Sequence, residues 1–211
     1  MKKMYLFLSM VTVFALALSA CAPAAPVATE PPAPTAVPPT AVPPTATEAP
    51  PAVGSAEHPI KVLFVPSVDA NVIVTGGEVM AAALKEATGL NFEVVVPTSY
   101  AATIEEMCAS PTDTMAFIPA FGYVLANDLC GVDVAFKAVR RGWGVYWTMI
   151  VVARDSDIDS IDDLNGKKFA FPDAGSTSGY LVPSVMLKDA GVTVGEELEA
   201  GGHPQAVRAV Y

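Results

Sequence analysis

Residues 175–179, Gly-Ser-Thr-Ser-Gly, place three hydroxyl side chains between two glycines, directly after a short apolar run and before a helix-like pattern. This spacing could serve two kinds of chemistry. It comes close to the G-x-S-x-G turn that carries the nucleophilic serine of many hydrolases. It also suits a cradle for a small anion, because the first N–H groups of a helix lack an intrahelical partner and carry partial positive charge.

The residue types argue against a hydrolase. The central position of the motif is Thr177 rather than serine, and a catalytic triad also needs a histidine and an acid. The chain has only two histidines, His58 at the end of a proline-rich segment and His203 close to the C-terminus. We therefore expect no catalytic residue, and an exported hydrolase that uses Thr177 or a neighbouring serine is the less favoured alternative.

The anion cradle depends on where the next helix begins. Pro183 is tolerated in the first turn of a helix but not deeper in it, so the helix should begin near residues 176–179, with the hydroxyls at its N-terminus. There the glycines would let an oxyanion approach the backbone. His203-Pro204 predicts a second helix start, with His203 as N-cap and Pro204 at the first helical position. A plain helix cap facing water, or an exposed loop around His203, would give the same patterns.

The N-terminus predicts export. Two lysines precede an apolar run from Met4 to Leu18, and Ser-Ala-Cys follows. A short cationic head, an apolar run of about fifteen residues and small residues before a cleavage point predict a signal peptide over residues 1–20. Leu-Ser-Ala-Cys resembles the bacterial lipobox, which implies that Cys21 becomes the lipidated first residue of the mature protein. The alternative is a plain signal peptide with an incidental cysteine.

Residues 21–58 are rich in proline, alanine and threonine, and Val-Pro-Pro-Thr-Ala occurs twice in tandem. Such a composition cannot bury enough apolar surface to offset chain entropy, so we expect a disordered tether. The tether would lift a folded part off the membrane, or serve as a spacer of no particular length.

The folded part should run from residue 59 to residue 211, about one domain's length or slightly more. The formal charge is −10, and removal of the two lysines of the signal peptide makes it more negative still. This charge disfavours nucleic acid as a partner, although a local site could still hold a small anion. No cofactor is indicated.

Cys108 and Cys130 are the remaining cysteines. In an exported domain they predict a disulfide, with two free thiols as the alternative. A zinc site is not expected, because no histidine lies near them.

Apolar strands and helices alternate along residues 59–154, which predicts a mostly parallel sheet covered on both faces, an α/β fold. We expect strands over residues 60–65, 91–97, 114–119, 132–140 and 146–154, and helices over 77–89, 99–110 and 120–129. Residues 146–154 would cross from a first lobe (59–153) to a second (154–211). A short helix near 161–164 and a strand from Lys167 begin the second lobe, which has only one full strand–helix unit.

Three segments carry a resemblance to a known family: residues 117–121 (Phe-Ile-Pro-Ala-Phe), residues 146–183, and residues 201–210 (Gly-Gly-His-Pro-Gln-Ala-Val-Arg-Ala-Val). Over residues 60–211 the chain resembles the PhnD-like solute-binding proteins of ABC importers, which bind phosphate, phosphite or phosphonate. The resemblance implies a two-lobed periplasmic-binding-protein-like fold of type II. It also implies further residues after Tyr211, so we expect a C-terminally truncated fragment with an incomplete second lobe.

The resemblance also implies a binding site. By position, Ser176, Thr177, Ser178 and Gly179 match the segment that holds the oxyanion, and His203 matches a histidine that contacts it. Tyr100 matches a tyrosine of the first lobe, and Tyr146 matches an aromatic residue of the crossing strand, although each could instead be a core aromatic. The expected function is capture of a phosphonate, phosphite or phosphate-type anion outside the cytoplasm, by a protein anchored to the cell membrane through its lipid, and delivery to a permease. A sulfonate is the alternative ligand.

Overall fold

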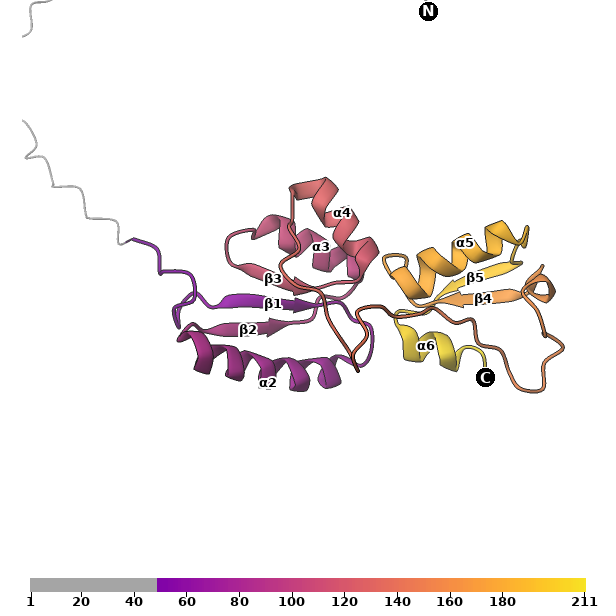
Figure 1. Ribbon diagram of the computed structural model, residues 1–211, viewed down its shortest axis with the longest axis horizontal. Helices are drawn as coiled ribbons and strands as arrows, with labels where there is room; N and C mark the ends of the chain where they lie inside the picture. Colours follow the sequence, from indigo (N-terminus) through magenta and orange to yellow (C-terminus); the bar gives the residue numbers. More distant parts are fainter. Residues whose placement is uncertain (1–48) are drawn as a thin grey trace, which may run out of the picture. The chain divides into compact units, whose positions relative to one another are not determined.

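The computed structural model describes residues 49–211, so the predicted signal peptide, Cys21 and most of the predicted tether lie outside the described residues. The first lobe contains a three-stranded parallel sheet in the order β2-β1-β3 (Figure 1). Its strands are β1 (Ile60–Phe64), β2 (Phe92–Val95) and β3 (Thr114–Phe117). Val62 of β1 pairs with Val94 on one side and with Met115 on the other. These three strands were predicted from their apolar runs.

Helices cover both faces of this sheet, as expected for a parallel sheet. Figure 1 shows α2 (Ala70–Thr88) on one face, and α3 (Tyr100–Ala109) and α4 (Ala120–Cys130) on the other. Ser99 caps α3 by accepting a hydrogen bond from the backbone N of Ala102 at 3.0 Å. Gly89 ends α2 in the left-handed conformation at φ 75°, which glycine adopts at no steric cost.

Helix α2 begins seven residues before the predicted start at Gly77. Asp69 is its N-cap, and the carboxylate accepts a hydrogen bond from the backbone N of Asn71 at 2.9 Å. Gly76 and Gly77 concealed this start, because glycine in a helix interior usually marks a boundary. Gly77 is required for packing: a Cβ atom there would lie 2.7 Å from Cγ1 of Val94.

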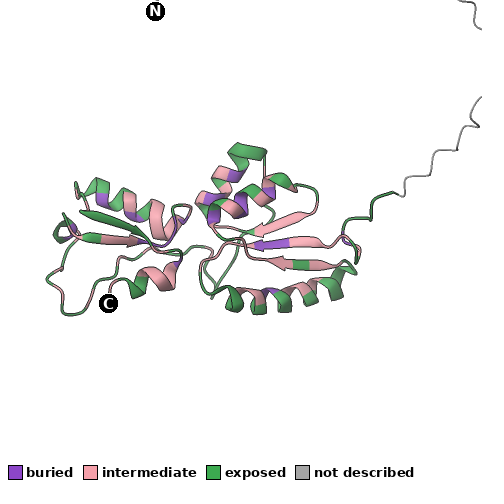
Figure 2. Cartoon of the chain, turned by 180° about the vertical axis from the view of Figure 1, so that it is seen from behind, coloured by how far each residue is buried: buried purple, intermediate pink, exposed green. Residues whose placement is uncertain are grey.

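The core of the first lobe lies between β1 and the α3–α4 layer, where Figure 2 shows most of the buried positions. Leu63 of β1 is fully buried on this side of the sheet. Ile104 and Met107 of α3 and Ala126 of α4 pack on that side of the sheet. Burial of these side chains fixes α3 and α4 to the sheet. Val62 is also fully buried but lies on the opposite face, which it shares with its pairing partner Val94 and with α2.

The strands predicted over residues 132–140 and 146–154 are not present. The chain there is irregular, apart from one antiparallel bridge between Arg140 and Trp143. Many of its apolar side chains are exposed, among them Phe136 by 89%, Trp147 by 67% and Met149 by 77%. Apolar alternation was read as a strand, but a strand also needs a neighbour to pair with, and no described residue pairs with these segments beyond that bridge.

The second lobe contains two parallel strands, β4 (Lys168–Phe171) and β5 (Glu196–Glu199). The 3-10 helix η1 (Asp162–Leu164) precedes β4. The π-helix η2 (Thr177–Leu181) leads directly into α5 (Val182–Asp189), and α6 (His203–Arg208) follows β5. Leu164, Phe171 and Leu187 form the core of this lobe. The α/β fold is therefore confirmed.

Strand β5 was not predicted. Its sequence, Glu-Glu-Leu-Glu, has no apolar alternation, and all four residues are exposed. It is held by parallel pairing with β4 and by an ion pair of 2.8 Å between Lys168 and Glu196. An exposed edge strand of this kind leaves little signal in a hydropathy pattern.

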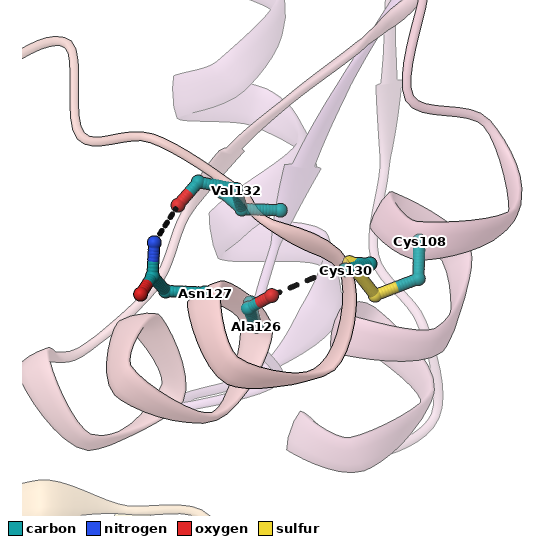
Figure 3. Close-up of a disulfide and its surroundings, with 5 residues drawn as sticks. All are labelled: Cys108, Ala126, Asn127, Cys130 and Val132. Carbon is teal, nitrogen blue, oxygen red and sulfur yellow. Dashed lines mark hydrogen bonds between the residues drawn. A yellow bond between two sulfur atoms is a disulfide. The ribbon is translucent and has the colours of Figure 1, made fainter.

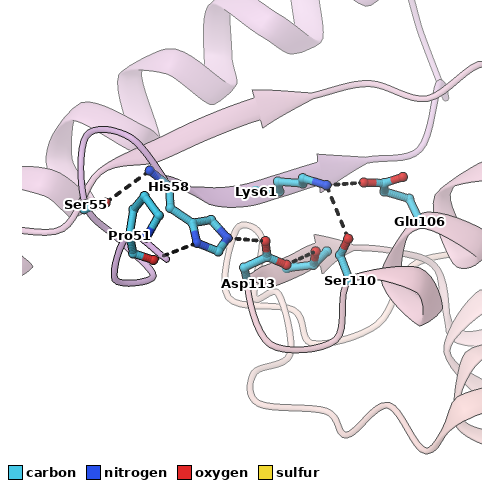
Figure 4. A network of polar contacts seen from close by, with 8 residues as sticks. Pro51, Ser55, His58, Lys61, Glu106, Ser110 and Asp113 are labelled. Carbon is cyan, nitrogen blue, oxygen red and sulfur yellow. Dashed lines mark hydrogen bonds and ion pairs between the residues drawn. The ribbon is translucent and has the colours of Figure 1, made fainter. Parts of the chain in front are cut away.

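Ordered contacts also extend into the segment assigned to the tether. The backbone N of Gly54 donates to the carbonyl of His58 at 2.7 Å, and the backbone N of Asn91 donates to the carbonyl of Gly54 at 2.8 Å. The imidazole of His58 meets the carboxylate of Asp113 at 2.7 Å (Figure 4). Residues 54–58 thus pack on the first lobe, ahead of its predicted start at residue 59.

The predicted disulfide is present. Cys108, near the C-terminal end of α3, is bonded to Cys130, the last residue of α4 (Figure 3). Next to it, the side-chain amide of Asn127 donates to the carbonyl of Val132 at 3.0 Å and holds the chain as it leaves α4. Within residues 49–211, no helix has the length and apolar character to cross a bilayer.

Candidate functional site

The residues between β4 and α5 form a tight turn, here called the hydroxyl loop (Asp173–Gly179). Its helix begins at Thr177, as predicted from Pro183. Ser176 is the N-cap, and its Oγ accepts a hydrogen bond from the backbone N of Gly179 at 3.1 Å. Ser176 is only 2% exposed, so its hydroxyl faces the protein interior, where it stabilises the start of the helix.

The two glycines that flank the hydroxyls are required by close packing. A Cβ atom at Gly175 would lie 2.7 Å from Cβ of Tyr100. A Cβ atom at Gly179 would lie 2.2 Å from Cγ of Pro172 and 3.0 Å from Cε1 of His203. Any larger residue would push the loop away from these neighbours, so the glycines bring the hydroxyls close to both lobes.

Thr177 connects the hydroxyl loop to the first lobe. Its Oγ1 accepts a hydrogen bond of 2.8 Å from the backbone N of Phe121, in the first turn of α4. The N-cap of α4 is Pro119, which makes no side-chain cap. The N-terminus of α4 therefore receives a side-chain oxygen from Thr177 of the second lobe and none from its own N-cap residue.

Asp173 makes a similar connection at the neighbouring helix. Its Oδ2 accepts a hydrogen bond from the backbone N of Tyr100, the first residue of α3, at 3.3 Å. Asp173 was not among the site residues predicted from the sequence. Its position directly after a strand, where ligands meet parallel sheets, was the signal that could have drawn attention to it.

Tyr100 and His203 both lie against Ser176. Burial raises the pKa of the Tyr100 hydroxyl; a hydrogen bond with Ser176 opposes the rise, and the nearby charges of Asp173 and Tyr146 add to it. Nε2 of His203 lies 3.4 Å from Oγ of Ser176. Burial lowers the pKa of His203, so its imidazole is neutral near pH 7. The structure thus brings two of the predicted site residues, Tyr100 and His203, against the hydroxyl of a third, Ser176.

The predicted cap role of His203 is wrong by one residue. The N-cap of α6 is Gly202, at φ 156°, and His203 is the first helical residue. The backbone N of His203 donates to the carbonyl of Ser67, in the loop between β1 and α2, at 3.2 Å. The imidazole of His203 therefore does not cap α6, and it points toward the hydroxyl loop.

Ser178 and Tyr146 are less constrained. The carbonyl of Ser178 accepts a hydrogen bond from the hydroxyl of Thr148, and within residues 49–211 the Ser178 hydroxyl makes no hydrogen bond. Tyr146 is 57% exposed, and it lies close enough to Tyr100 to be a minor cause of the raised pKa of that residue. The structure places both near the other site residues without fixing their side chains. Thr148 was missed because its segment was read as a regular strand.

The chemistry that this arrangement offers is recognition of negative charge. The first turns of η2 and α4 meet at Thr177, and each presents backbone N–H groups with partial positive charge. Two depressions on the surface lie elsewhere, along α2–β2 and along β2–α3, and neither is lined by a residue of the predicted site. Among residues 49–211, no group of three or more potential metal ligands is found.

A family model for the periplasmic phosphonate-binding proteins of ABC transporters matches residues 62–211, more than half of the chain. The chain belongs to this family. A curated relative, the phosphate-import protein PhnD of Mycolicibacterium smegmatis, is 31% identical over 141 residues, which cover 60% of this chain and 44% of the relative. The resemblance found in the sequence is therefore confirmed.

Two solved structures of similar proteins share the two-lobed fold. A binding-protein component of an ABC phosphonate transporter from Pseudomonas aeruginosa is 21% identical, with a TM-score of 0.62 over 72% of this chain and 53% of that protein. PhnD1 from Prochlorococcus marinus, solved with methylphosphonate, is 17% identical, with a TM-score of 0.54 over 72% of this chain and 59% of that protein. The chain thus spans about half the length of these members of the family.

Proposed function

We propose that this protein is the solute-binding component of an ABC importer and that it captures a phosphonate, phosphite or phosphate-type oxyanion between its two lobes. The observation that carries the proposal is the hydrogen bond from the backbone N of Phe121 to Oγ1 of Thr177. A neutral oxygen of one lobe there meets the N-terminus of a helix in the other. An anion oxygen would receive the same donors and would gain from the dipoles of both helices.

The ligand-binding residues in this proposal are Ser176, Thr177, Ser178, Gly179, His203, Tyr100 and Tyr146. Thr177 and Ser178 would donate hydroxyls to the anion, and His203, being neutral, would donate one ring N–H. Ser176 would act mainly by fixing the helix start and by holding Tyr100 and His203. Three or four charge-assisted hydrogen bonds, less the cost of desolvation, correspond to a Kd of about 1 μM.

Calorimetry would test this proposal. The protein would be titrated with methylphosphonate, phosphite, phosphate, sulfate and methanesulfonate. We expect binding of at least one phosphorus oxyanion, and a loss of about tenfold or more for Thr177→Ala with Ser178→Ala, since each removes a donor to a charged group. Thr75→Ala is the matched control, because the Thr75 hydroxyl donates to the carbonyl of Asn71 within α2, away from the hydroxyl loop.

Three results would count against the proposal. Binding of none of the phosphorus oxyanions would contradict the function. Unchanged binding in the double variant would contradict the site. Preference for methanesulfonate would favour the alternative ligand class, a sulfonate.

A hydrolase is the alternative from another class, and the contact between Ser176 and His203 is the observation that favours it. Three features oppose it. Ser176 is buried and holds the helix start, His203 has no carboxylate partner among the described residues, and the central Thr177 accepts a hydrogen bond from Phe121. We therefore infer that the protein does no chemistry. Turnover of a phosphate or carboxylate ester that Ser176→Ala abolishes would overturn this inference.

The proposal includes an extracytoplasmic location and two further partners. An ABC permease would receive the ligand, and a lipid on Cys21 would anchor the protein to the cell membrane. Support for the location comes from the family and from the Leu-Ser-Ala-Cys sequence. Radiolabelled palmitate should label the wild-type protein in bacterial cells and should not label Cys21→Ser. Equal labelling of the two proteins would contradict the anchor.

A further inference from the structure

Asp173 joins the two lobes through its carboxylate. Oδ2 accepts a hydrogen bond from the backbone N of Tyr100, in the first lobe, at 3.3 Å. Oδ1 accepts one from the backbone N of Gly175, in the hydroxyl loop, at 2.7 Å. The residue is only 8% exposed. An acidic side chain is thus buried beside the place where the proposed function puts an anion.

Such a position calls for a physical reason, because a carboxylate near an anion site repels the ligand. The contacts supply one. The first N–H groups of a helix need acceptors, and a negative charge there gains from the helix dipole. Ser99 caps α3 through the backbone N of Ala102, and Asp173 serves the backbone N of Tyr100. Two of the first three N–H groups of α3 therefore have side-chain acceptors within the protein.

Helix α4 is treated differently. Its N-cap, Pro119, makes no side-chain cap, and the oxygen that meets the backbone N of Phe121 is the neutral hydroxyl of Thr177. An anion can join or replace a neutral hydroxyl far more easily than it can replace a carboxylate. The two helix N-termini thus differ. That of α3 is bound by the carboxylate of Asp173, and that of α4 remains accessible to a ligand.

Gly175 supports this assignment independently. A Cβ atom at residue 175 would lie 2.7 Å from Cβ of Tyr100 and 3.2 Å from Oδ1 of Asp173. The loop approaches α3 as closely as a backbone without a side chain allows. The carboxylate of Asp173 and the lack of a side chain at Gly175 therefore both support the contact between the hydroxyl loop and α3.

We propose that Asp173 is a positioning residue for anion capture, whose carboxylate takes the place of an anion at the N-terminus of α3 and so docks the hydroxyl loop on the first lobe before a ligand arrives. This proposal rests on the proposed function for its effect on affinity. The docking itself does not depend on which anion binds, because both hydrogen bonds of Asp173 are made to backbone N atoms of the protein.

Asp173→Asn is the informative substitution, since an amide keeps the size of the side chain but presents an NH₂ group to one of its two N–H donors. Spin labels on non-natural residues at positions 85 and 188, one in each lobe, would leave the disulfide intact and report the distance between the lobes. Without ligand, we expect a shift toward longer distances in Asp173→Asn. Calorimetry with methylphosphonate should show binding weaker by about tenfold, because the binding-competent arrangement is less populated.

Three variants complete the experiment. Asp189→Asn, a carboxylate at the exposed end of α5, should change neither measurement. Gly175→Ala should lengthen the distance with Asp173 intact, and it tests the same contact if Asp173→Asn does not fold. Asp173→Glu keeps the charge and should restore part of the short-distance population, which a loss of packing alone would not predict.

The outcomes separate the two proposals. Unchanged distances in Asp173→Asn and Gly175→Ala would overturn the role of Asp173 whatever the ligand. If the wild-type protein binds none of the phosphorus oxyanions, the proposed function fails, and the ligand-free distances still decide whether Asp173 docks the loop.

Discussion

At the scale of single residues, Gly179 is one of the most tightly packed glycines among the described residues. A methyl group at this position would approach Cγ of Pro172 to 2.2 Å, and a proline ring cannot rotate away. Gly179→Ala should therefore shift the hydroxyl loop and destabilise the protein by about 1–3 kcal/mol, the usual cost of overpacking. Denaturant unfolding would measure this change.

The matched control is Gly76→Ala. Gly76 lies inside α2, and an added Cβ would have no atom within 4 Å apart from those of its chain neighbours and of the adjacent backbone of the helix. There alanine should stabilise the helix by about 0.5–1 kcal/mol, because glycine is the more flexible residue in the unfolded chain. A loss of stability for Gly76→Ala, or none for Gly179→Ala, would contradict the packing described for these two positions.

His58 and Asp113 make stability depend on pH. The hydrogen bond with Asp113 raises the pKa of His58 above its ordinary 6.5, and the same bond lowers the pKa of Asp113 below 3.8. The contribution of His58 is present below pH 6.5 and is lost as the pH rises through its raised pKa. The contribution of Asp113 is present above pH 3.8 and is lost as the pH falls through its lowered pKa. The ion pair is complete between these limits.

We therefore expect His58→Ala to lower the Tm most near pH 5.5 and less at pH 8.5, when the wild-type imidazole is neutral. Thermal unfolding of both proteins across this range would measure the difference. Asp113→Asn should give the same pH dependence, because it removes the other half of the pair. His203 acts in the opposite direction in both proteins, since its lowered pKa makes acid destabilising, and it cancels in the comparison. A difference in Tm that stays constant with pH would contradict the assignment.

At the scale of elements, the sequence predicted what is encoded locally. Gly89 and Ser99 bound their helices as expected, because a left-handed turn and a hydroxyl cap are local requirements. Pro183 correctly located the start of the helix that carries the hydroxyls. Residues 132–154 were misread and β5 was missed, because a strand depends on a partner as well as on its own residues.

For the candidate site too, residues with a local sequence pattern were predicted, and residues defined by distant contacts were missed. The hydroxyls and His203 were visible from residue type, since helix starts that carry donors leave a sequence pattern. Asp173 and Thr148 were not found, because their importance lies in contacts with distant residues: Tyr100 is 73 positions from Asp173, and Ser178 is 30 positions from Thr148. One of the flanking glycines, Gly175, was explained by anion approach, whereas its closest neighbour in the structure is Tyr100.

The disulfide offers an element-scale prediction. Replacing Cys108 and Cys130 by serine opens a link across 22 positions, which should lower the free energy of unfolding by about 3 kcal/mol in the chain-entropy model. Urea unfolding of the wild-type and double-serine proteins would measure the loss. The same protein with and without dithiothreitol provides the control, and equal midpoints in all samples would contradict a stabilising bond.

At the scale of the whole molecule, the irregular segment between the lobes leaves a large apolar surface exposed. Phe136, Trp147 and Met149 are each more than 60% exposed, and single exposed apolar residues are common but a run of them is not. We expect the chain by itself to bind an apolar dye such as ANS and to self-associate. Light scattering and dye fluorescence would show both effects.

Phe136→Ser with Trp147→Ser should reduce dye binding and self-association. Val79→Ser, an exposed apolar residue on α2, is the control and should change them little. A monomeric chain that binds no dye would contradict the expectation.

The bond between Cys108 and Cys130 also bears on when the protein can function. It ties the C-terminal ends of α3 and α4, about 15 Å from the N-termini that receive Asp173 and Thr177. In a reducing cytoplasm the cysteines stay as thiols, and the two helices are free to shift against each other. Oxidation after export would then fix the spacing of the two N-termini. Under the function proposed above, affinity for the anion would then be low among the phosphate esters of the cytoplasm and would rise only after export.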